Sequence, residues 1–92
     1  MMNYMNKYLV EFIGTFVFLF VILYIGEPVA IGMALILVIY FGGSISGGHF
    51  NPAVSIMMFM KGSLEKCCII PYIIAQILGG LTALQLYNLV KK

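Results

Sequence analysis

The chain has 92 residues, of which 63% are hydrophobic and 9% are charged, and its mean hydropathy is +1.10. A soluble domain has roughly half apolar and a quarter charged residues, so this composition indicates an integral membrane protein. The net charge of +2 is too small and too scattered for a nucleic-acid-binding surface. With one histidine, no aspartate and only two adjacent cysteines, we expect no enzyme activity, metal or cofactor.

The first long apolar run extends from about residue 8 to residue 25 and ends at the turn Gly26-Glu27-Pro28. It is too long for the apolar part of a signal peptide, and no small-x-small cleavage site follows, so we expect it to stay in the mature protein. A second run begins at about residue 29 and becomes glycine-rich after Phe41, before the crossing ends near residue 47. Since a helical crossing takes about 20 residues, part of this one is expected to be tilted helix or loop.

A short helix is predicted from about residue 52 to residue 60, directly after the glycine-rich segment. Asn51 is a favoured N-cap residue, and Pro52 suits the first helical position because its missing N–H would be unpaired there. The helix is apolar but too short to cross a bilayer. Broken helices at membrane depth are tolerated only when buried in protein or lining a watery cavity. The pattern therefore predicts a re-entrant half-helix.

The last apolar run extends from about residue 67 to residue 90, after a polar connector over residues 61–66. Cys67 and Cys68 begin this run, and we interpret them as buried small hydrophobes because adjacent cysteines rarely satisfy disulfide geometry. No repeat or linker divides the chain. We therefore expect an all-α membrane protein with one domain over residues 1–92, built from three transmembrane helices and one half-helix.

The lysines are nearly balanced between the two faces of the membrane. If the half-helix enters and leaves on one side, Lys7, Lys61 and Lys66 share that face, and Lys91 and Lys92 lie on the other. Three lysines against two is a weak bias under the positive-inside rule. Two interpretations stay open: one fixed orientation with a poor signal, or insertion in both orientations.

Three motifs follow one another along the chain. The first is Glu11-Phe12-Ile13-Gly14-Thr15 in the first apolar run, the second is the segment from Ser46 to Val54, and the third is Ala75-Gln76-Ile77-Leu78-Gly79-Gly80 in the last run. In order and spacing they resemble the first-helix motif, the Ser-Gly-x-His-x-Asn-Pro-Ala-Val loop and the third-helix pattern in the N-terminal half of an aquaporin, in the major intrinsic protein family of water and glycerol channels.

The resemblance implies roles for particular residues. Asn51, Pro52 and Ala53 would form one side of a pore centre, where the Asn51 amide donates to a passing water. Backbone carbonyls of Gly47, Gly48 and His49 would line the pore, with the His49 side chain bracing the loop. The structural polar residues would be Glu11, which accepts hydrogen bonds from the loop, and Gln76.

The selectivity filter is where the chain departs from the family pattern. In the second half of a family pore, an arginine stands three residues after the asparagine. The matching position in this chain is Val54, and the chain contains no arginine. Ile31 and Ile39 fall at or near two further filter positions. Such an apolar mouth would discriminate poorly among small neutral solutes, so we expect passage of water, with glycerol, urea and ammonia as further candidates.

A pore of this family needs two inverted halves, and the sequence carries one Asn-Pro-Ala motif. The expected partner is an inverted copy of the same chain, so that two chains form an antiparallel homodimer. We expect this dimer to lie in the lipid bilayer of the cell membrane. Pores of the family usually form tetramers, which would require eight chains. The alternatives are a separately encoded second half, a non-transporting membrane subunit, a truncated fragment, and a dual-topology exporter that uses Glu11 as its coupling carboxylate.

Overall fold

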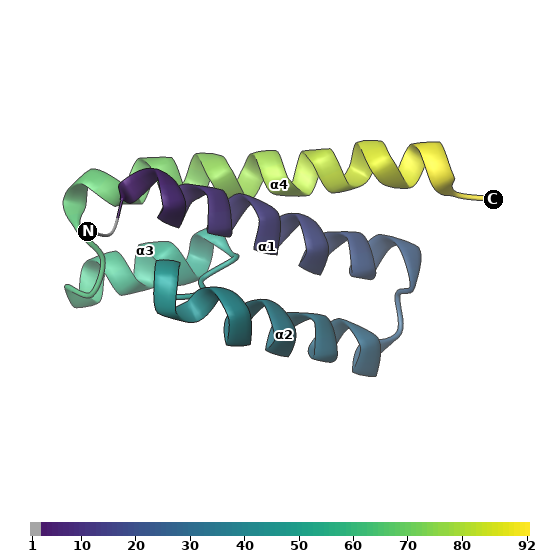
Figure 1. Cartoon of the computed structure of the whole chain (residues 1–92), viewed down its shortest axis with the longest axis horizontal. Coiled ribbons are helices and arrows are strands. Elements are labelled where there is room, and N and C mark those ends of the chain that lie inside the picture. Colours follow the sequence, from purple (N-terminus) through teal and green to yellow (C-terminus); the bar gives the residue numbers. More distant parts are fainter. Residues whose placement is uncertain (1–2) are drawn as a thin grey trace.

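The structure is a computed structural model that describes residues 3–92, and within that range it is entirely helical, with no strand (Figure 1). The elements are α1 (Tyr4–Tyr24), α2 (Pro28–Ser46), α3 (Pro52–Lys61), the 3-10 turn η1 (Lys66–Cys68) and α4 (Ile69–Val90). Helices α1, α2 and α4, the last together with η1, are long and apolar enough to cross a membrane, whereas α3 is shorter. The predicted all-α membrane fold is confirmed.

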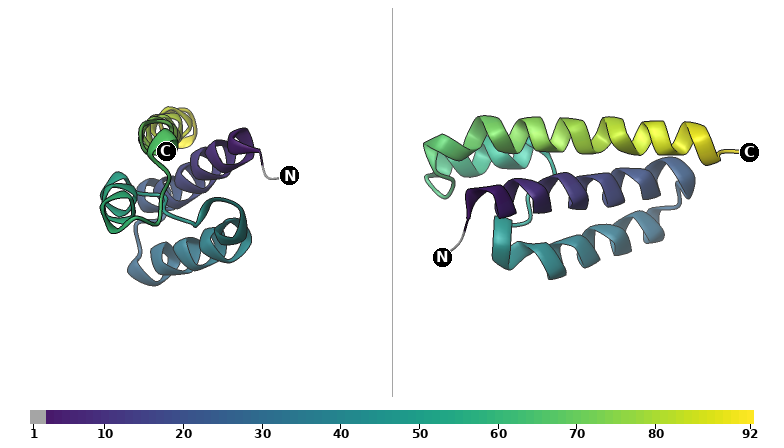
Figure 2. Two further views of the ribbon diagram at one scale, coloured as in Figure 1. Left: turned by 90° about the vertical axis from the view of Figure 1, so that its left-hand side faces the viewer. Right: turned by 45° about the horizontal axis from the view of Figure 1, so that its top comes forward.

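The three long helices run along the longest dimension of the molecule, which measures 42 Å (Figures 1 and 2). We call the part of the bundle that holds the first turns of α1 and residues 47–68 the loop end (Figure 1). The opposite end holds the α1–α2 turn and the last turns of α4, and we call it the open end. Helix α3 begins partway along the bundle and runs back to the loop end (Figure 1). Its start therefore lies between the two ends of the bundle (Figure 1).

Helix boundaries follow from local capping chemistry. The Glu27 carboxylate accepts hydrogen bonds from the N–H groups of Val29 and Ala30, at 3.1 and 2.9 Å, and so starts α2. Gly47 directly follows α2 and Gly62 directly follows α3, and both glycines have φ values above +90°. Glycine adopts this left-handed conformation without steric cost, so each helix stops where the next residue permits it.

The glycine-rich part of the second crossing, for which the sequence left tilted helix or loop open, is helical. Helix α2 continues through residues 42–46 and ends only at Ser46. A Cβ atom at Gly42 would lie 2.7 Å from the Val10 side chain, so this glycine serves close packing inside a helix and does not end it. The prediction for Cys67 is wrong, because Cys67 is exposed and only Cys68 is buried.

Helices α1 and α4 make the closest contact in the bundle at Gly79. A Cβ atom built there would lie 2.7 Å from the carbonyl oxygen of Phe12 and 3.1 Å from the backbone nitrogen of Phe16. Glycine at such a crossing lets two backbones approach directly. This contact fixes α4 against the same helix that carries Glu11.

Candidate functional site

Glu11 lies fully buried at the centre of the loop end, and its carboxylate accepts four hydrogen bonds. Oε1 accepts from the backbone N–H of Phe50 at 2.8 Å and from the Gln76 amide at 2.8 Å. Oε2 accepts from the backbone N–H of His49 at 3.0 Å and from the Ser46 hydroxyl at 2.7 Å. A buried carboxylate is costly unless it is paired in this way. Glu11 therefore holds the loop between α2 and α3 inside the bundle.

A second set of hydrogen bonds ties the loop to α3 and α4. His49 Nδ1 and the Ser55 hydroxyl lie 2.8 Å apart, and the Gln76 amide donates to the same hydroxyl at 2.8 Å. The Tyr72 hydroxyl donates to the carbonyl of Ser46 at 2.6 Å, and its ring packs against that of His49. The His49 side chain is thus held on two sides, and its backbone enters the loop in one defined geometry.

Phe50 is the loop residue that sequence reasoning did not single out. Its φ of +54° places it in the left-handed region, which is unusual for a bulky residue. Its ring is buried against the two positions where a Cβ would collide with it, Gly14 on α1 and Gly42 on α2. The signal in the sequence was the pair of glycines. Gly14 makes room for this ring.

Asn51 is exposed and stands at the start of α3. Its side-chain oxygen accepts a hydrogen bond from the N–H of Ala53 at 2.8 Å, which is an N-cap bond. The cap uses only the oxygen, so both N–H groups of the amide nitrogen are left as donors. They stand beside the positive end of the helix dipole.

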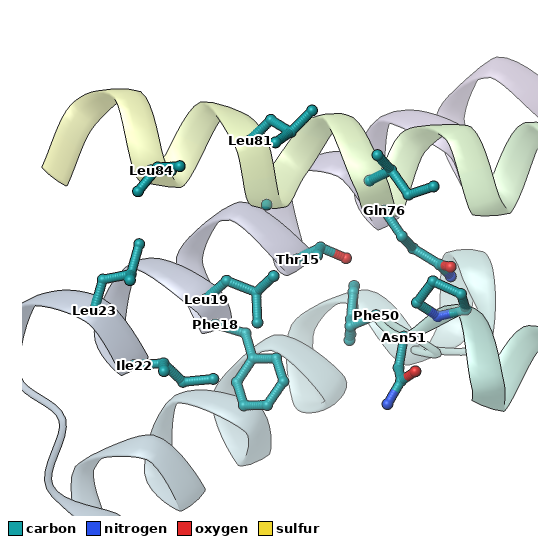
Figure 3. Close-up of a pocket in the computed structure, with 13 residues that line it drawn as sticks. Thr15, Phe18, Leu19, Ile22, Leu23, Phe50, Asn51, Gln76, Leu81 and Leu84 are labelled. Carbon is teal, nitrogen blue, oxygen red and sulfur yellow. The ribbon is translucent and has the colours of Figure 1, made fainter. Parts of the chain in front are cut away.

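An apolar groove of about 570 Å³ runs from Asn51 along α1 and α4 toward the open end (Figure 3). Thr15 and Gln76 border the Asn51 end of this groove. The Thr15 hydroxyl and the Gln76 carbonyl oxygen are buried without a hydrogen-bond partner among residues 3–92. Most of the remaining wall is apolar and includes Phe18, Leu19, Ile22, Leu23, Leu81 and Leu84.

The structure brings together only part of the expected filter. Ile39 lies next to Gly48, where a built Cβ would be 3.5 Å from the Ile39 side chain. Ile31 lies eight residues earlier in the same helix, about 12 Å along its axis. Val54 is half-buried in the first turn of α3. Of the expected pore carbonyl residues, Gly47 is exposed, Gly48 is half-buried and His49 is buried.

No group of three or more potential metal-binding side chains occurs within the described part of the chain. The polar side chains of the loop end are used to hold backbone in place. Three apolar helices and a re-entrant half-helix fastened by a buried carboxylate define a polytopic membrane protein with irregular backbone at membrane depth.

Comparisons with known proteins identify the family. The sequence matches the family described as major intrinsic protein over residues 1–92, and the chain belongs to that family. It fits the N-terminal half of an aquaporin, and it is an integral membrane protein. No solved structure matches it.

Three relatives illustrate the range of similarity. The chain is 46% identical over 88 residues to glycerol uptake facilitator protein-like 6 of Lactiplantibacillus plantarum, covering 86% of this chain and 41% of that protein. It is 37% identical over 94 residues to aquaporin Z of Photorhabdus laumondii, with the same two coverages. It is 39% identical over 99 residues to aquaporin-8 of Mus musculus, covering 96% of this chain and 38% of the relative. The chain therefore spans about two fifths of the length of these relatives.

Proposed function

We propose that this chain forms a passive channel for water and small neutral solutes, as one half of a pore that an inverted second copy completes. The observation that carries the proposal is the position of Asn51. Its donor groups are exposed at the start of a half-helix that begins between the two ends of the bundle (Figure 1). The names of the relatives, aquaporin and glycerol uptake facilitator, support the same class of solute.

The mechanism rests on the amide of Asn51. With its oxygen held by the cap bond, the amide presents N–H groups that donate to the oxygen of a passing water. The dipole of α3 favours the same orientation. Two opposed Asn51 groups would turn both hydrogens of the central water outward, which interrupts a chain of proton transfer. Carbonyls of Gly47, Gly48 and His49 would supply acceptors along the approach.

The groove supports an inverted copy as the second half. The free side-chain N–H groups of Asn51 would cost several kcal/mol if they faced lipid. The outer face of α3 also exposes Ile56, Met57 and Met60. If a second copy is related by a two-fold axis in the membrane plane, its α3 meets the first end to end and continues along the groove. The partner then also lies near the orphaned polar atoms of Thr15 and Gln76.

The lysines fit a chain that inserts in both orientations. Lys7, Lys61 and Lys66 lie toward the loop end, and Lys91 and Lys92 lie at the open end. An excess of one lysine on one side favours one orientation only weakly under the positive-inside rule. Assembly of four such dimeric pores, with eight chains, is the further expectation that the family suggests.

Solute choice in the proposed channel depends on an apolar mouth. Ile39 beside Gly48 offers few hydrogen bonds to a solute, and Val54 stands where the second half of a family pore carries arginine. Ile31 would complete the set at the outer part of the mouth. We assign water as the main solute, followed by glycerol, urea and ammonia. Ions are excluded by dehydration cost and by the two half-helix dipoles.

Osmotic response tests the channel. Liposomes that carry the protein should shrink faster than empty liposomes after an osmotic jump, and Asn51→Leu should bring the rate close to the empty value. Asn51→Asp keeps a capping oxygen but removes the N–H donors, so it separates conduction from helix capping. Asn88→Leu, at an exposed position on α4, is the matched control and should leave the rate unchanged. Wild-type liposomes that behave like empty ones would refute the channel.

Crosslinking tests the inverted copy. Met60 ends α3 near the loop end, whereas Leu84 lies about 22 Å beyond the start of α4, so the two are far apart within one chain. In the antiparallel dimer, the partner's α3 reaches along the groove toward Leu84. In a background of Cys67→Ala and Cys68→Ala, Met60→Cys with Leu84→Cys should give a disulfide-linked dimer. Met60→Cys with Ile70→Cys, which pairs two loop-end positions, should not. A conducting protein without the first crosslink would point to a different second half.

A further inference from the structure

Two adjacent thiols lie directly before the start of α4, and the proposed channel does not use them. The sulfur atoms of Cys67 and Cys68 lie 3.8 Å apart, and both cysteines are free. Cys67 is exposed, whereas Cys68 is 1% exposed. The pair thus has one sulfur that a reagent in water can reach and a second one directly behind it.

The buried sulfur is held in place by its surroundings. The Tyr8 hydroxyl donates to Cys68 Sγ at 3.8 Å, and the Tyr8 ring packs edge-on against Tyr72 at 5.9 Å. Cys68 also borders a cavity of about 250 Å³ at the loop end, together with Lys7 and Glu65. The second thiol is therefore fixed in position and has free volume beside it.

We propose that Cys67 and Cys68 form a binding site for trivalent arsenicals that carry one organic substituent. Thiolates are soft ligands and prefer soft, thiophilic centres. A zinc site would need four ligands, and no third ligand-type side chain joins the pair within residues 3–92. An arsenic atom that already carries one carbon substituent takes only two sulfurs, and adjacent thiols can bind it in a chelate.

The reaction is balanced without an oxidant. With phenylarsine oxide, the arsenic–oxygen double bond breaks and two arsenic–sulfur bonds form. The two thiol protons leave with the oxygen as one water molecule, and no atom changes its oxidation state. The thiols and the product are all neutral, so the buried position of Cys68 carries no penalty for a new charge. One bridging atom also relaxes the ring that a direct disulfide between neighbours would close.

The site can be tested by binding alone, independently of transport. Reduced full-length protein in detergent is treated with phenylarsine oxide and weighed intact by mass spectrometry. The expected mass gain is one phenylarsine oxide less one water per chain. A small dithiol should remove the adduct, whereas a monothiol at the same thiol concentration should not. An adduct that a monothiol removes equally well would overturn the proposal.

Two variants show whether binding needs adjacent thiols or only two thiols anywhere in the chain. Cys67→Ala changes an exposed side chain and should lower the retained adduct at least tenfold. Ser63→Cys combined with Cys68→Ala keeps two thiols but moves one into the connector, and it should show the same loss. Circular dichroism and elution volume establish that each variant is folded. If the relocated pair retained the arsenical as well as the wild type, the site would not exist as proposed.

Discussion

The loop end and the open end of this bundle are held together in opposite ways. At the loop end, buried polar side chains gather around Glu11, whose carboxylate oxygens bond to loop, α2 and α4 together. Toward the open end, α1 carries a stack of aromatic rings at Phe16, Phe20 and Tyr24, and α1 and α4 together line an apolar groove of about 570 Å³. One end is closed by hydrogen bonds, and the other is left open.

The two ends differ in how far their polar groups find hydrogen-bond partners within the described residues. Hydrogen bonds at the loop end fix irregular backbone that lipid would not tolerate. The groove has no such closure, and the Thr15 hydroxyl and the Gln76 carbonyl oxygen beside it have no hydrogen-bond partner in the described part of the chain. The inverted copy that we propose would supply contacts to this groove. The following predictions test the comparison, from the largest expected effect to the smallest.

Replacing Glu11 should remove the loop end as a folded unit. Glu11→Leu removes the acceptor of four hydrogen bonds and leaves the backbone N–H groups of His49 and Phe50 without a partner among the described residues. At about 1–3 kcal/mol for each unsatisfied group, together with the lost bonds from the Ser46 and Gln76 side chains, the cost is a large part of the stability of a small domain. We expect loss of folded protein, measured by denaturant titration in detergent with circular dichroism. Gln85→Leu, an exposed polar position on α4, is the control and should change stability little. Equal stability of both variants would contradict the central role of Glu11.

Gly79 joins the two regions, and a side chain there should force α1 and α4 apart. Gly79→Leu would collide with the Phe12 carbonyl oxygen and the Phe16 nitrogen, which are backbone atoms that cannot rotate away. We expect destabilisation of about 3 kcal/mol or more, at the upper end of overpacking effects. Gly32→Leu has no atom within 4 Å of the new Cβ, so it is the matched control. Thermal unfolding in detergent compares the two, and a similar loss in both would argue against the close crossing.

Glu27 should contribute only a local stabilisation at the open end. Glu27→Ala removes the cap of α2 and is expected to cost about 1 kcal/mol. Glu27→Gln keeps one accepting oxygen and should lose less. Hydrogen exchange of the Val29 and Ala30 amides reports the fraying directly. If Glu27→Ala were as damaging as Glu11→Leu, the contrast between the two ends would be wrong.

Much of the frame could be predicted from the sequence because its causes are local. Hydropathy and length place the three long helices, and Asn51 with Pro52 marks the start of α3. The persistence of α2 through Gly42 could not be predicted in this way, because it depends on Val10 and Phe50 packing from elsewhere. The left-handed backbone conformation of Phe50 could not be predicted from local sequence either.

The candidate site also has features with local causes, which the sequence predicts, and features with long-range causes, which it does not. That Asn51 caps α3 and still exposes its amide follows from the chemistry of one residue and its neighbours. That Ile39 approaches Gly48 while Ile31 lies two turns away depends on where the loop folds back. The groove depends on the spacing between α1 and α4, which no local pattern records. Sequence reasoning therefore located the motif better than the space around it.

The burial of Phe50 has a consequence for the order of folding. Its ring occupies space between Gly14 of α1 and Gly42 of α2, so its binding pocket exists only after those two helices have paired. The contact with Gly14 also closes a chain segment of 36 residues, which is entropically slower than pairing adjacent helices. We therefore expect α1 and α2 to insert and pair first, with the loop and α3 entering the membrane afterwards. The half-helix is then the last of these elements to fold, and it packs onto a helix pair that has already formed.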